Sequence, residues 1–243
     1  MTRRRAAAAC LGLLVGLLET GARAQLIEIA AAPAPPAPAP APGPAPVWTV
    51  AMGLRTMYVK SAGLDPFSTD DALSQFSLAG TYAFMRRGRL ALAAGLELDV
   101  GGTGSAARGA ASSLSLTTIS AVLEGRYQAA SRFQLFARLS PGLLHGAASI
   151  SDPSGLPGAG LGESFDTFSL EAAAGGAFAL TAIPGTRVRI WLLADGGYSW
   201  AAAQHLLLAP GLGADQNKAG ALDLGTLAPR GGFFRLAAAL SYD

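Results

Sequence analysis

The chain of 243 residues is short of charge, cysteine and histidine. Charged residues make up 14% of it, against about 25% in a typical soluble domain. The 18 basic and 16 acidic side chains leave a net charge of +2, and no basic block lies beyond the extreme N-terminus. That distribution excludes the concentrated positive face that nucleic-acid binding needs. Beyond the N-terminus the chain also lacks an apolar run of about 18 residues, which excludes a membrane protein built from helices.

The first 24 residues have the pattern of a secretory signal peptide. Arginines at 3–5 precede an apolar run at 6–18, and Ala22-Arg23-Ala24 resembles a small-x-small cleavage site. The apolar run is short for a membrane span, so we expect cleavage after Ala24. The single cysteine, Cys10, lies within this run, and the exported chain therefore cannot depend on disulfides.

Residues 25–46 form a Pro/Ala-rich stretch, with proline at nearly every second position from Pro33 to Pro46. Proline fixes φ and removes a backbone donor, so this composition predicts a semi-rigid periplasmic linker. A ligand for a proline-binding partner is the alternative. The remaining domain is predicted to span residues 47–243.

From residue 47 onward the dominant hydrophobic period is two, which predicts strands. Eight apolar alternations, most of them about as long as a tilted membrane strand, cover residues 48–58, 76–84, 90–100, 119–127, 133–143, 168–180, 188–198 and 234–242. Short connections at 86–88, 129–131 and 183–185 alternate with long ones at 61–73, 101–113, 146–164 and 201–231. This order indicates an all-β fold: an eight-stranded antiparallel up-and-down transmembrane β-barrel with short periplasmic turns and long outer loops.

Alternation alone also suits a soluble barrel, but the second face of each strand favours the membrane. That face carries many Ala and Gly residues, which suit a narrow interior better than a solvated surface. All ten charges within the predicted strands also lie on it, where five basic and five acidic groups can pair across the lumen. These charges are Arg55, Glu97, Asp99, Glu124, Arg126, Arg138, Glu171, Arg189, Asp195 and Arg235.

Aromatic residues lie at the ends of the apolar faces, as membrane interfaces favour. The predicted interface aromatics are Trp48, Tyr58, Tyr82, Tyr127, Tyr198 and Tyr242. We therefore expect the apolar face of each strand to contact outer-membrane lipid and the charges to be enclosed.

The C-terminus resembles the assembly signal of outer-membrane barrels, in which an alternating strand ends in an aromatic residue. Arg235, Leu240 and Tyr242 match that spacing, with Ala237 in place of a glycine and Asp243 following the aromatic. From about residue 47 to the end, the chain resembles the small barrel domains of the OmpA, OmpX and OmpW kind. The resemblance implies the fold, an outer-membrane location and a partner in the barrel-assembly machinery.

Candidate chemistry is sparse. A lipid-deacylating barrel resembling PagL would offer His and Ser two residues apart on one strand, whereas Ser149 is four residues from His145. His205 lies in the last long connection, and Asp65, Asp70 and Asp71 in the first could hold calcium, although a solvated loop is the simpler interpretation. We expect no enzyme, no metal and no cofactor.

Three functions remain open. The first is a structural or surface-binding role, in which the long loops contact an extracellular ligand or partner. The last connection is unusually apolar, with leucines that could cover the barrel mouth or bind a hydrophobic ligand: Leu206, Leu207, Leu208, Leu212, Leu222, Leu224 and Leu227. The others are a narrow channel for small ionic or hydrophobic solutes, and an outer-leaflet lipid-modifying enzyme.

Overall fold

The computed structural model describes residues 46–107, 110–151, 160–210 and 220–242. The predicted signal peptide, residues 1–24, and all but Pro46 of the predicted linker, residues 25–46, lie outside the described residues. The described residues belong to one compact unit, Pro40–Asp243. Among them, no helix has the length and hydropathy to cross a bilayer.

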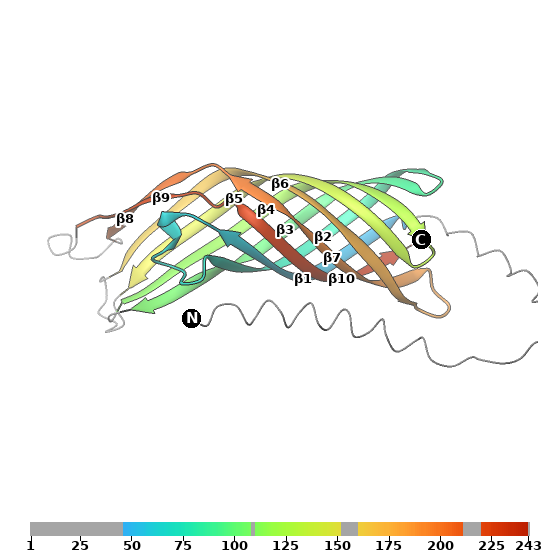
Figure 1. Cartoon of the computed structure of the whole chain (residues 1–243), viewed down its shortest axis with the longest axis horizontal. Helices are drawn as coiled ribbons and strands as arrows, with labels where there is room; N and C mark the ends of the chain where they lie inside the picture. The colour runs from blue at the N-terminus through green and yellow to red at the C-terminus, as the bar shows by residue number, and fades with distance from the viewer. Residues whose placement is uncertain (1–45, 108–109, 152–159, 211–219, 243) are drawn as a thin grey trace, which may run out of the picture. The chain divides into compact units, whose positions relative to one another are not determined.

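Eight antiparallel strands close into a ring, which confirms the predicted barrel (Figure 1). The last strand pairs with the first over twelve positions, from Trp48 opposite Tyr242 to Val59 opposite Gly231. Closure leaves no unpaired strand edge, as hydrocarbon requires. In ring order the strands are β1 (Trp48–Val59), β2 (Ala72–Arg87), β3 (Leu90–Ala107), β4 (Ala110–Ala130), β5 (Phe133–Ser151), β6 (Leu161–Ala182), β7 (Val188–Ala201) and β10 (Gly231–Tyr242).

The three short turns lie close to their predicted positions, but the first two begin two residues later in the chain than expected. β2 continues through Arg87, which leaves Gly88 and Arg89 as the turn, and Gly88 takes the positive φ (60°) that glycine tolerates best. A β-bulge precedes each short turn, with a register shift at Phe84, Ala129 and Leu180. The extra residue changes which face the following side chains occupy.

Two of the long connections are largely strand, contrary to prediction. Of the expected loops at 101–113 and 146–164, residues 101–107, 110–113, 146–151 and 161–164 belong to the ends of β3–β6, which contain 18, 21, 19 and 22 residues. A tilted strand needs only about 9–11 residues to cross the bilayer. These four strands therefore extend well beyond the membrane on the long-loop side.

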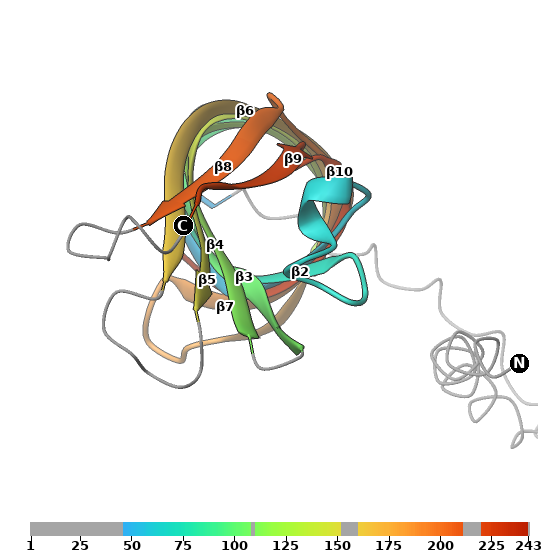
Figure 2. The same ribbon diagram turned by 90° about the vertical axis from the view of Figure 1, so that its left-hand side faces the viewer.

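The first and last long connections fold over the same end of the barrel. Residues between β1 and β2 include a short helical turn, η1 (Ala62–Leu64). The expected loop at 201–231 contains a hairpin of β8 (Gln204–Pro210) and β9 (Leu222–Leu227). Figure 2 looks into this end, where β8 and β9 cross part of the opening.

Hydrophobicity changes sides along the strands at one level of the barrel. In β4–β6, the outward row Ile119, Leu143 and Phe168 is apolar and exposed. The next outward row, two residues further along each strand, is Thr117, His145 and Asp166. Above that level the inward face becomes apolar instead, with Leu114, Leu116, Leu144 and Phe165 all buried. The outer boundary of the hydrocarbon therefore lies between the two rows.

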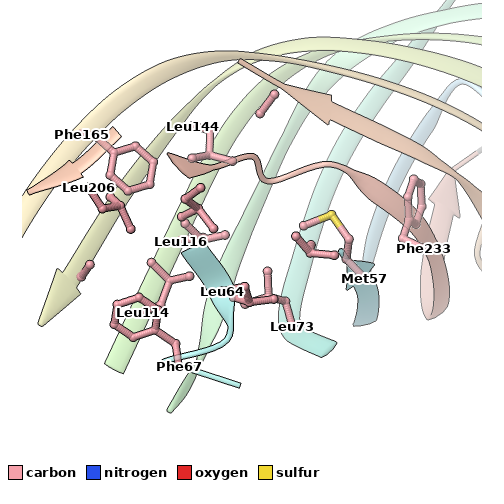
Figure 3. Close-up of a cluster of buried hydrophobic side chains, with 14 of the residues drawn as sticks. Met57, Leu64, Phe67, Leu73, Leu114, Leu116, Leu144, Phe165, Leu206 and Phe233 are labelled. Carbon is pink, nitrogen blue, oxygen red and sulfur yellow. The ribbon is translucent and has the colours of Figure 1, made fainter. Parts of the chain in front are cut away.

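A cluster of buried apolar side chains fills the outer end of the barrel, here called the apolar cap (Figure 3). It includes three leucines of the β8–β9 hairpin, namely Leu206, Leu208 and Leu227, each at most 1% exposed. Leu207 and Leu222 remain exposed, and Leu212 lies outside the described residues. The cap further contains Met57, Val59, Leu64, Phe67, Leu73, Leu114, Leu116, Leu144, Ala148, Phe165, Ala173, Ala201 and Phe233. The described part of the apolar last connection thus folds over part of the barrel mouth, as the first of the two predicted alternatives expects.

The proposed boundary predicts how cysteine probes react in a Cys10→Ser background. Ser115→Cys and Leu123→Cys both point outward from β4, at sites that are exposed in the bare protein. We expect a membrane-impermeant maleimide to label the first readily and the second hardly at all in lipid vesicles, because lipid covers Leu123. Both should react fully in urea-unfolded protein, and equal labelling in vesicles would contradict the boundary.

Candidate functional site

Nine of the ten predicted strand charges are buried inside the barrel, at 7% exposure or less. They come from seven strands and face one another across the lumen. The tenth, Arg189, lies at the start of β7, near the short-turn rim, and is only half-buried. Its position opposite Ser241 places it at the edge of the interior rather than within it.

The centre of the lumen holds two arginines between two carboxylates, an arrangement called the ion cluster below. Arg235 donates to Asp195 at 3.0 Å and also pairs with Glu97. Arg138 donates to the same two carboxylates, at 3.2 Å to Glu97 and 3.1 Å to Asp195. Ser77 adds a hydroxyl that donates to Glu97 at 3.0 Å. Each charge has at least two partners, as burial in a low dielectric requires.

The ion cluster continues toward the short turns. Arg126 donates to Glu124 at 2.6 Å and to the hydroxyls of Thr49 and Thr81, at 3.1 and 2.5 Å. Glu124 also lies 3.8 Å from Arg138, so this pair joins the centre. The side chains involved come from β1, β2, β4 and β5, and they tie opposite walls of the barrel together.

A second group lies toward the outer end, where the lumen meets the apolar cap. Arg55 pairs with Asp99 at 2.8 Å and with Glu171 at 2.5 Å. Its guanidinium also lies 4.2 Å from the centre of the Phe233 ring, a cation–π contact. Phe233 belongs to the apolar cap. Arg55 therefore joins the charged part of the interior to its apolar part.

Little free space remains around the ion cluster. Two cavities border it, of about 30 and 20 Å³. One water needs roughly 10–15 Å³ measured in this way, so each cavity has room for about one or two waters. Small inward residues, namely Ala51, Ala79 and Ala237, line the larger of the two cavities.

The two histidines lie outside the barrel interior. His145 Nδ1 and Asp166 Oδ1 are 2.8 Å apart on the exposed surface of β5 and β6. Ser149 bonds to Ser113 at 2.8 Å. Four residues along a strand separate Ser149 from His145 by roughly 13 Å. The structure therefore does not bring Ser149 and His145 together as a nucleophile and its base.

His205 and the acidic loop residues also lie apart from the interior. His205 Nε2 is 3.3 Å from Asp223 Oδ1 across the β8–β9 hairpin. Asp65 and Asp70 are exposed beside η1, and Asp71 takes a positive φ of 53°. In the part of the chain that the structure describes, no group of three or more His, Cys, Asp or Glu residues is placed to hold a metal ion.

The six predicted interface aromatics all point outward, at 42–59% exposure. Trp48, Tyr82 and Tyr242 are cross-strand neighbours near the short-turn end, and the Trp48 and Tyr82 rings lie 4.7 Å apart. Tyr58 and Tyr198 lie at the opposite edge of the apolar belt, each one strand from Gly232. Two levels of outward aromatics flank the aliphatic belt, as in transmembrane barrels.

The C-terminal residues predicted to signal assembly divide between the two faces of β10. Arg235 points into the ion cluster, whereas Leu240 and Tyr242 point outward. The structure thus gives Arg235 an interior contact, and its part in assembly stays a prediction.

No family model and no curated protein matches the sequence. Among solved structures, the barrel is similar to Ail, the attachment invasion locus protein of Yersinia pestis, at 16% identity and a TM-score of 0.46, covering 81% of this chain and 99% of that one. It is also similar to Neisserial surface protein A (14%, 0.46, covering 83% and 99%) and to the outer membrane protease OmpT from Escherichia coli (9%, 0.47, covering 83% and 98%). The strand pairing described above establishes the eight-stranded barrel independently of these similarities.

The ion cluster predicts a large effect for removing Arg138. Arg138→Ala leaves Glu97 and Asp195 with Arg235 alone, and should lower the free energy of unfolding by about 3–5 kcal/mol. Urea unfolding in detergent micelles or vesicles measures the change. Arg132→Ala, at the exposed β4–β5 turn, is the matched control and should stay within about 0.5 kcal/mol of the parent. Equal stability of the two variants would contradict a structural role for the cluster.

Proposed function

We propose that this chain is a closed outer-membrane barrel whose role is structural or surface-binding, carried by the part that extends beyond the membrane. The observation that carries the proposal is the filled lumen. The ion cluster blocks the barrel at the depth of the membrane, and the apolar cap fills it above. A channel would need a continuous wet path, whereas each of the two cavities beside the ion cluster has room for only about one or two waters.

The outer end offers a suitable contact surface. Above the membrane boundary, β4–β6 present small polar side chains outward, with Ser113, Ser115 and Ser149 among them. The strands are paired to the ends described, so the surface is rigid and costs little conformational entropy on binding. Leu207 and Leu222 add exposed apolar area on the hairpin.

Charge suggests the chemistry of a partner. The described charged residues at the outer, long-loop end of the barrel are mainly acidic. The basic residues there are Lys60 and Arg230. The acidic set is Asp65, Asp70, Asp71, Glu163, Asp166 and Asp223. A surface of this sign favours an extracellular partner that presents basic groups.

An enzymatic role has less support. The exposed His145 and Asp166 pair could orient a base, but the nearest candidate nucleophile on the same strand, Ser149, bonds to Ser113. Loss of a lipid-modifying activity in His145→Ala would favour that alternative.

Planar-bilayer recording tests whether the barrel is closed. Purified protein should show no steady unitary conductance, because two independent layers fill the lumen. A variant lacking the hairpin residues 204–227 should also stay silent, since the ion cluster lies below the cap. Steady conductance from the parent protein would contradict the proposal and favour the narrow channel.

Surface plasmon resonance tests the preference for a basic partner. Immobilised, detergent-solubilised barrel should bind polylysine more tightly than polyglutamate, and the difference should shrink as salt rises. The double variant Asp71→Asn, Asp166→Asn should bind polylysine several-fold more weakly, because two surface charges are removed. Asparagine suits the positive φ of residue 71, which limits structural disturbance. Equal binding of both polymers would contradict the preference.

A further inference from the structure

The three short turns of the barrel are basic. These turns and the adjoining strand ends, residues 84–90, 131–132 and 183–187, are all described and contain no acidic residue. Their five arginines, all exposed, are Arg86, Arg87, Arg89, Arg132 and Arg187. Three of the five lie in or next to one turn: Arg89 is in the turn between β2 and β3, and Arg86 and Arg87 end β2. The short turns of such barrels face the periplasm, at the level of the inner-leaflet headgroups.

The bulge at Phe84 turns one of these arginines toward lipid. Before the bulge, even-numbered residues of β2 such as Tyr82 point outward. After it, Met85 pairs with Leu92 and Arg87 with Leu90. Cross-strand partners share a face, and both leucines are exposed on the lipid side. Arg87 therefore lies on the outer surface of the barrel, at the edge of the apolar belt.

Arg87 stands at one end of a groove on that outer surface. The groove has a volume of about 550 Å³ and is lined mainly by apolar side chains. Its floor is formed by Gly125 and Ala137, which are partners in β4 and β5. Its outward walls are Met85, Leu90, Leu92, Tyr127 and Leu135. Volume and lining are typical of a site that binds a small apolar or amphipathic molecule.

We propose that this groove binds one anionic phospholipid of the periplasmic leaflet. The groove opens to the lipid side of the wall, so its natural occupant is an acyl chain, which would lie over Gly125 and Ala137. Arg87 would hold the phosphate, for which the planar guanidinium is well suited. Arg89, in the turn beside the groove, adds further positive charge, which disfavours the ammonium of a zwitterionic headgroup.

The proposal rests on the transmembrane assignment but not on the role of the outer surface. A barrel that lost surface binding would still be expected to hold the lipid, because groove and outer surface lie at opposite ends of the strands. Failure of one proposal is therefore distinguishable from failure of the other.

Native mass spectrometry of the full barrel in detergent micelles tests the site, with dioleoylphosphatidylglycerol as the anionic probe and dioleoylphosphatidylcholine as the neutral one. We expect one phosphatidylglycerol to bind in preference to phosphatidylcholine. Arg87→Gln should weaken it about tenfold, since hydrogen bonds to charged groups contribute roughly that much. Arg187→Gln removes the same charge from the β6–β7 turn, away from the groove, and should leave binding close to that of the parent.

A second pair of variants tests the groove without changing charge. Gly125→Leu would fill the floor, and the structure accommodates it, since an added Cβ meets only Leu92 Cδ2 at 3.9 Å. Gly80→Leu is the matched control on the lipid face of β2, where an added Cβ meets nothing within 4 Å. Gly125→Leu should abolish the preferred lipid and Gly80→Leu should not. Equal lipid loss from Arg87→Gln and Arg187→Gln, or unchanged binding in Gly125→Leu, would overturn the proposal.

Discussion

The whole architecture depends on one property of hydrocarbon, which offers no hydrogen bonds to a polypeptide. Every backbone group in the membrane must find its partner within the wall, and the twelve-residue pairing of β10 with β1 completes that requirement. A ring of eight strands is narrow, so its interior admits side chains but little water. Charges enclosed there have to satisfy one another. The multiple contacts of Arg138 and Arg235 with Glu97 and Asp195 follow from the closure of the wall.

The strands cross two solvents, and their patterning changes accordingly. In the membrane they are apolar outside and polar inside, whereas above it they are polar outside and apolar inside. Only a closed wall permits this exchange of polar and apolar faces. In the membrane the strands form a transmembrane barrel, and above the membrane the same strands enclose an apolar core, as the wall of a water-soluble protein does. Arg55 stands at the transition, with carboxylates on one side and the Phe233 ring on the other. Each part of the lumen therefore has its own filling, ion pairs in the membrane part and apolar side chains above it.

The membrane part of the fold could be predicted from sequence because period-two patterning continues there without interruption. The extensions of β3–β6 were wrongly predicted as loops, since the alternation changes phase where the strands leave the lipid. Adjacent apolar residues mark that point, as in Leu143-Leu144, where the first side chain points to lipid and the second into the apolar cap. The pairing of Arg138 with Glu97 and Asp195 needed the register of distant strands, which composition and spacing do not give. Arg87 was missed for a similar reason, because a bulge reverses its face.

The β-bulges next to the short turns have a physical consequence for the rim. Strict alternation through residue 87 would point Arg87 toward the lumen and Arg86 toward the lipid, and the bulge exchanges the two faces. It places the Arg87 guanidinium outside, where lipid phosphate is the available counter-charge. At the opposite end, acidic residues predominate among the described surface charges. The two ends of the wall therefore present opposite charge to two different environments, and one inserted residue in β2 is enough to assign Arg87 to the membrane surface rather than to the interior.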